Sequence, residues 1–208
     1  LLQSLLSIVL ALGGGFFLQV AGRMSPYEAA WSYFSAAAAL EVLALAYGSC
    51  GPIEVEGAVL LGGLLSLFRY LDLPSDFAGL GLAIAAWCLA GISYAERRAG
   101  GEEALRLRRV RARAISSATL AVTGLWLAST HLFAPPSLFV ALAFLSLGLL
   151  TLLPASRLAS TALGTISFLL LGVGVHIFGG WLGALPLWRP AARLAAALLM
   201  IYATKPGL

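Results

Sequence analysis

Two histidines, His131 and His176, are the only ones in this sequence of 208 residues, and both lie near the ends of long apolar stretches. Each is followed by an aliphatic residue and then by phenylalanine. If helices begin at Ala114 and Leu158, a rise of about 1.5 Å per residue places both imidazoles roughly 26 Å from the inner ends of those helices. Two neutral imidazoles at one depth, on helices that run in the same direction, can bind the two axial positions of a low-spin haem iron.

This arrangement resembles that of the membrane b-type cytochromes, which hold haem between histidines on alternate helices of a bundle. The resemblance covers about 114–203. It implies one haem b, bound by His131 and His176 near the outer face, with Arg189 and Arg193 as counter-charges for the haem propionates. The two-haem cytochromes carry a second, deeper pair of histidines that this sequence lacks, so at most one such haem is expected.

The two histidines also have interpretations without haem. An amphipathic side chain often lies at a membrane interface with its ring packed against apolar groups and its nitrogen in water. A transition-metal site or a proton relay is a further alternative. A zinc site would be incomplete, because three or four ligands are usual and the stretch 114–203 contains no Asp, Glu or Cys to complete one.

Glu41 is an acidic residue inside a long apolar stretch, and such residues are functional candidates because their desolvation must be offset. It is a possible proton or ion site. The alternative is a structural role, in which a protonated Glu41 accepts a hydrogen bond from the indole of Trp87 at a similar depth and joins two helices.

The composition predicts the surroundings of these residues. Hydrophobic residues make up 61% of the sequence and charged residues 11%, which is too few polar groups to cover a water-soluble globule of this length. We therefore predict an all-α, polytopic protein of the cell membrane. The two cysteines, Cys50 and Cys88, lie in or at the end of apolar stretches, which indicates small buried residues rather than a disulfide.

A basic segment at 96–113 orients the predicted helices. It contains seven of the 13 Lys and Arg residues, and loops of this composition stay on the cytoplasmic side of a membrane. This clustering indicates topology and gives no reason to expect nucleic-acid binding. Five arginines near its end are expected to contact anionic lipid headgroups, each contributing about 1 kcal/mol. They are Arg106, Arg108, Arg109, Arg111 and Arg113.

The apolar stretches predict about eight transmembrane helices with both termini in the cytoplasm. The predicted spans are 2–22, 28–48, 57–71, 76–94, 114–134, 137–154, 158–178 and 190–203. The first lacks a preceding basic residue, which favours a span over a secretion signal. Two four-helix units are expected, 1–95 and 114–208, joined by the basic segment as a cytoplasmic loop.

Three functions are compatible with these features. The first is an electron-transfer subunit that binds one haem between the two histidines. The second is a non-catalytic structural subunit of a larger membrane complex, with other membrane subunits as partners, because polar groups are so few. The third is a small transporter or channel centred on Glu41. The zinc-protease, nucleophile-elbow and Walker A motifs are absent from the sequence, which leaves enzymatic activity undecided.

Overall fold

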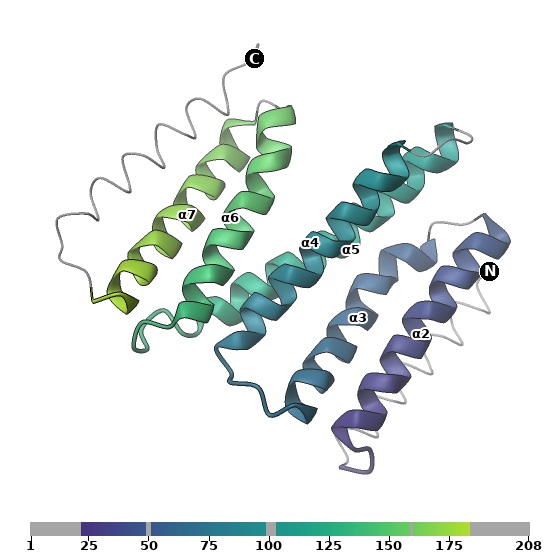
Figure 1. Ribbon diagram of the computed structural model, residues 1–208. Helices are drawn as coiled ribbons and strands as arrows, with labels where there is room; N and C mark the ends of the chain where they lie inside the picture. Colours follow the sequence, from purple (N-terminus) through teal and green to yellow (C-terminus); the bar gives the residue numbers. More distant parts are fainter. Residues whose placement is uncertain (1–21, 49–50, 99–102, 159, 184–208) are drawn as a thin grey trace. The chain divides into compact units, whose positions relative to one another are not determined.

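The computed structural model describes residues 22–48, 51–98, 103–158 and 160–183, and the regular structure in these ranges is α-helical (Figure 1). Its helices are α2 Pro26–Tyr47, α3 Gly51–Tyr70, α4 Phe77–Arg98, α5 Glu103–Ser129, α6 Leu138–Leu158 and α7 Thr161–Trp181. The chain divides into two compact units. In the described ranges, unit 1 contains α2, α3, α4 from Ala85 onward and α5 up to Leu120, and unit 2 contains the remainder.

Four of these helices are long and apolar enough to cross a membrane, namely α2, α3, α4 and α7. The apolar part of α6, Leu138–Pro154, is shorter. These helices support the prediction of a helical membrane protein. The predicted spans at 2–22 and 190–203 lie outside the described residues, and so do both termini, so the count of eight spans and the cytoplasmic termini stay predictions.

The start and end of α2 follow from local sequence signals. Ser25 caps the helix, because its Oγ accepts a hydrogen bond from the Glu28 backbone N at 3.3 Å while its own backbone N donates to the Glu28 carboxylate at 2.9 Å. Pro26 fits the first turn because its missing N–H would have no helical partner there. Gly48 ends the helix in the left-handed conformation, with φ 59°.

Two predicted loops are largely helical. The stretch 49–56 lies between the predicted spans 28–48 and 57–71, but α3 already begins at Gly51. The basic segment 96–113 was expected to be a loop, but α4 continues to Arg98 and α5 begins at Glu103. In the basic segment, Glu, Ala, Leu and Arg are strong helix formers, so α4 and α5 extend beyond their apolar parts. In α3, Pro52 lies in the first turn, where proline is tolerated. In contrast, α5 ends at Ser129, before the predicted end at 134.

In unit 1, α2 packs beside α3 (Figure 1). A hydrogen bond from the Gly57 backbone N to Ser116 Oγ joins α3 to α5. Tyr33, Leu40 and Val59 are buried between α2 and α3. The helices α4 and α5 run antiparallel, because Ser93 Oγ donates to the Val110 carbonyl at 3.2 Å and Ser117 Oγ donates to the Ala86 carbonyl at 2.8 Å. Hydrogen bonds of this kind hold helices together where lipid removes the hydrophobic driving force.

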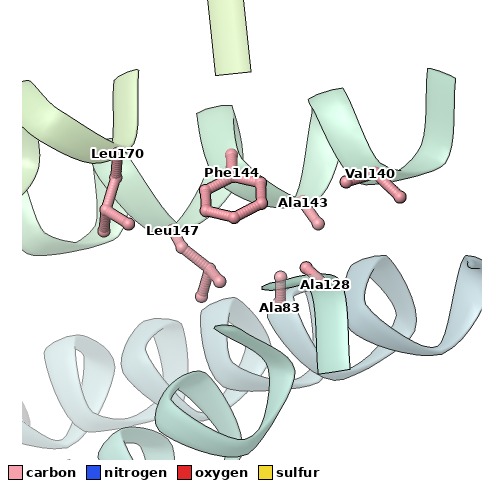
Figure 2. Packing of buried hydrophobic residues seen from close by; sticks show 7 residues of the cluster. All are labelled: Ala83, Ala128, Val140, Ala143, Phe144, Leu147 and Leu170. Carbon is pink, nitrogen blue, oxygen red and sulfur yellow. The ribbon is translucent and has the colours of Figure 1, made fainter. Parts of the chain in front are cut away.

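In unit 2, a cluster of small and aliphatic side chains forms the core. Figure 2 shows Ala83 of α4 and Ala128 of α5 facing Ala143 and Leu147 of α6. Gly148 allows α6 to approach α7 closely, because a Cβ at this position would lie 2.7 Å from the Leu171 side chain. Small residues at helix contacts allow this close packing.

Candidate functional site

One arginine and three glutamates from four different helices meet in unit 1. Arg113 Nε donates to Glu96 Oε1 at 2.8 Å, and its Nη1 donates to Glu56 Oε2 at 3.1 Å. Its Nη2 donates to Glu41 Oε1. We call Glu41, Glu56, Glu96 and Arg113 the Arg113 cluster. A guanidinium suits this position because its donors point in several fixed directions from one plane.

The helix directions explain why these residues meet. Glu41 lies in the second half of α2, and Glu96 lies in the last turn of α4. Glu56 lies in the second turn of α3, and Arg113 lies in the first half of α5. Because α2 and α4 run toward the end of unit 1 from which α3 and α5 start, all four side chains reach the same level. Arg97 and Arg98 of α4 and the first arginines of α5 lie at this end as well.

The cluster is shielded from solvent to different degrees. The Arg113 side chain is 7% exposed and the Glu56 side chain 10% exposed, whereas Glu96 and Glu41 are 24% and 31% exposed. Charges in such surroundings are costly unless they are paired, and their interactions are screened less than in water. Glu56 and Arg113 therefore form the buried centre of the cluster, and Glu41 and Glu96 form its more exposed side.

The cluster contains more acid than base. With every group ionised, three carboxylates face one guanidinium, and two carboxylate oxygens, Glu41 Oε2 and Glu96 Oε2, are buried without a hydrogen-bond partner. Arginine keeps its proton under all ordinary conditions, so the exchangeable protons belong to the glutamates.

A metal ion does not fit the cluster. In the described part of the chain, no three His, Cys, Asp or Glu side chains come close enough together to bind a metal ion. The guanidinium of Arg113 occupies the point where the three carboxylates converge. The cation that this arrangement can accept is a proton on a carboxylate.

The structure changes the expected surroundings of Glu41. The sequence predicts a hydrogen bond between Glu41 and the indole of Trp87, but the Glu41 carboxylate pairs with Arg113. Trp87 is half-buried in α4. The prediction that Cys88 is buried is wrong, because this residue lies on an exposed position of α4. Cys50 lies outside the described residues.

The histidines lie at one end of unit 2. His131 is half-buried in the turn that follows α5, and His176 is an exposed residue near the C-terminal end of α7. Arg189 and Arg193, the expected counter-charges of a haem, lie outside the described residues. Haem binding by His131 and His176 therefore stays a prediction.

The five arginines of α5 separate into different environments. Arg108 and Arg111 are exposed, and Arg106 and Arg109 are half-buried. Arg113 was expected at lipid headgroups, but it is buried and bound by three carboxylates. Arg113 lies seven residues, or about two helical turns, after Arg106, so the two side chains project from the same, more buried face of α5.

Glu56, Glu96 and Arg113 were not recognised as partners of Glu41 from the sequence. A comparison of depths could have found them, because Glu41 and Glu96 lie toward the C-terminal ends of their helices, whereas Glu56 and Arg113 lie toward the starts of theirs. No family model, curated protein or solved structure matches this chain. The residues of the site are therefore the basis for inferring a function.

Proposed function

We propose that this chain is a small transporter or channel of the cell membrane that moves protons, with the Arg113 cluster as its proton-binding site. The observation that supports this proposal is the excess of carboxylates in the cluster. Glu41 and Glu96 each have one buried oxygen without a hydrogen-bond partner, and one guanidinium compensates at most one of three negative charges. Proton uptake by either glutamate relieves this imbalance.

The exposure of the four side chains favours exchange over a purely structural role. Glu41 is the most exposed member and Glu56 is nearly buried, so the carboxylates lead from the exposed side of the cluster to its buried centre. Arg113 contacts all three carboxylates and holds them close together, which couples their protonation. Apolar side chains of similar volume often stabilise a helix contact as well as a buried ion network does, so helix packing alone gives little reason for this cluster.

Proton flux into liposomes tests this function. The purified chain is reconstituted with a pH-sensitive dye inside, and an inward driving force is set by a potassium gradient and valinomycin. We expect the wild type to acidify the interior, and Glu41→Gln to lower the flux to the level of empty liposomes, because an amide cannot exchange a proton. Glu54→Gln is the matched control, since Glu54 is exposed on α3 beside the cluster and makes no part of it.

Two further measurements make the flux experiment decisive. Thermal unfolding of Glu41→Gln in detergent checks that the variant is folded, and Glu41→Asp, which keeps a carboxylate, should retain part of the flux. Wild-type protein that conducts no more than empty liposomes would contradict the proposal. So would a folded Glu41→Gln variant that conducts like the wild type.

An electron-transfer function with one haem b is a second candidate. It is favoured by the positions of His131, which follows the end of α5, and His176, which lies in the last turns of α7, because these two helices run in the same direction. We expect protein purified from cells with ample haem to show a Soret band that is lost in His131→Ala and in His176→Ala. Colourless wild-type protein would exclude this function. The structural role with other membrane subunits as partners stays a prediction from the sequence.

A further inference from the structure

The arginines of α5 fall on two faces of the helix. Arg106, Arg109 and Arg113 are spaced three and four residues apart and share one face, on which burial increases toward Arg113. Arg108 and Arg111 are spaced three residues apart, lie on the other face and are exposed. The buried face serves the Arg113 cluster, and the exposed face has no described carboxylate partner.

The last turn of α4 adds two exposed arginines at the same level. Glu96 pairs with Arg113, and Ser93 bonds the carbonyl of Val110, so the end of α4 lies beside the beginning of α5. Arg97 and Arg98 follow Glu96 directly, and both are exposed.

The Arg98 guanidinium also lies 4.5 Å from the ring centroid of Tyr94. Arginine and tyrosine at the end of a membrane span are typical of residues at the interface between lipid and water.

We infer that Arg97, Arg98, Arg108 and Arg111 form a binding surface for the phosphate groups of anionic phospholipids. A membrane lipid is the fitting partner because the candidate span of α4 ends at Arg98, which places these guanidinium groups where headgroup phosphates lie. Four guanidinium groups on two adjoining helix ends can donate several charge-assisted hydrogen bonds to such phosphates. On α5, the described acidic residue nearest in sequence to Arg108 and Arg111 is Glu103, which is exposed at the start of the helix. Its single negative charge offsets only part of the positive charge of the four arginines. This surface is separate from the Arg113 cluster and does not depend on the proposed function.

Titration of a fluorescent phosphatidylglycerol into the full chain in neutral detergent tests this surface. At about 1 kcal/mol for each arginine, Arg108→Gln combined with Arg111→Gln should weaken the apparent affinity roughly 25-fold. Arg69→Gln is the matched control, because Arg69 is exposed at the other end of α3 and its loss should leave the affinity unchanged. Both altered positions are exposed, so the variants should fold like the wild type.

Two additional ligands identify what the surface recognises. Fluorescent phosphatidylcholine should bind the wild type and the double variant equally, because its headgroup has no net charge. Inorganic phosphate at the same concentration should not displace phosphatidylglycerol. The inference is overturned if the double variant and Arg69→Gln bind phosphatidylglycerol alike, or if inorganic phosphate displaces the lipid.

Discussion

Replacing Arg113 by methionine is expected to destabilise the folded protein by about 3–5 kcal/mol, the usual cost of removing one partner from a buried ion pair. The reason is that Glu56 is nearly buried and would lose its counter-charge, while Glu41 and Glu96 would face it as like charges. Thermal unfolding in detergent, followed by circular dichroism, measures the effect. Arg111→Met is the matched control, because Arg111 is exposed on the same helix and its replacement should change the stability little.

The stability of Arg113→Met should also depend on pH in a defined direction. Without the guanidinium, the folded variant holds protons on carboxylates that are free to ionise when the chain unfolds, so the folded state binds more protons than the unfolded state. Stability must then rise as the pH falls. Adding Glu41→Gln and Glu56→Gln to Arg113→Met should restore much of the lost stability. Equal unfolding temperatures for Arg113→Met and Arg111→Met would contradict the role of the cluster.

The positions of the helices could be predicted from the sequence because apolar stretches of sufficient length leave few alternatives. Six of the predicted spans, from 28 to 178, overlap helices of the structure. The helix ends were harder to predict. Hydrophobicity indicates which residues can lie in lipid. A helix, however, begins and ends at capping residues, as α2 does at Ser25 and Gly48. Polar residues between apolar stretches were therefore assigned to loops although they continue α3, α4 and α5.

The Arg113 cluster has no local signature in the sequence, because its contacts link residues far apart along the chain. Arg113 meets Glu41 and Glu56 across 72 and 57 positions, and neither spacing has a local signature. The presence of Glu41 in an apolar stretch did identify one member, since burying a carboxylate requires a compensating partner. Its partner Arg113 belongs to a group of closely spaced arginines, a pattern that indicates topology and not a buried ion pair.

Replacing Gly57 by alanine is expected to destabilise the protein by about 1–3 kcal/mol, the usual cost of overpacking. A Cβ at this position would lie 2.6 Å from Ser116 Cα and 2.7 Å from its carbonyl oxygen. These are backbone atoms, so no side-chain rotation can relieve the contact and α3 must move away from α5. That movement would also weaken two hydrogen bonds of the Ser116 hydroxyl, which accepts from the Gly57 N–H at 3.1 Å and donates to the Ile53 carbonyl at 2.6 Å.

Gly91→Ala provides the matched control for this prediction. Gly91 also lies inside a helix that is long and apolar enough to span a membrane, but a Cβ there would meet nothing within 4 Å. Alanine should therefore leave the stability unchanged or raise it by roughly 0.5–1 kcal/mol, because it restricts the unfolded chain more than glycine does. Since Glu56 precedes Gly57 and Arg113 lies one turn before Ser116, the displacement in Gly57→Ala should also separate this ion pair. Proton flux should then fall together with the unfolding temperature in Gly57→Ala and remain at the wild-type level in Gly91→Ala, and equal unfolding temperatures in the two variants would contradict the close contact between α3 and α5.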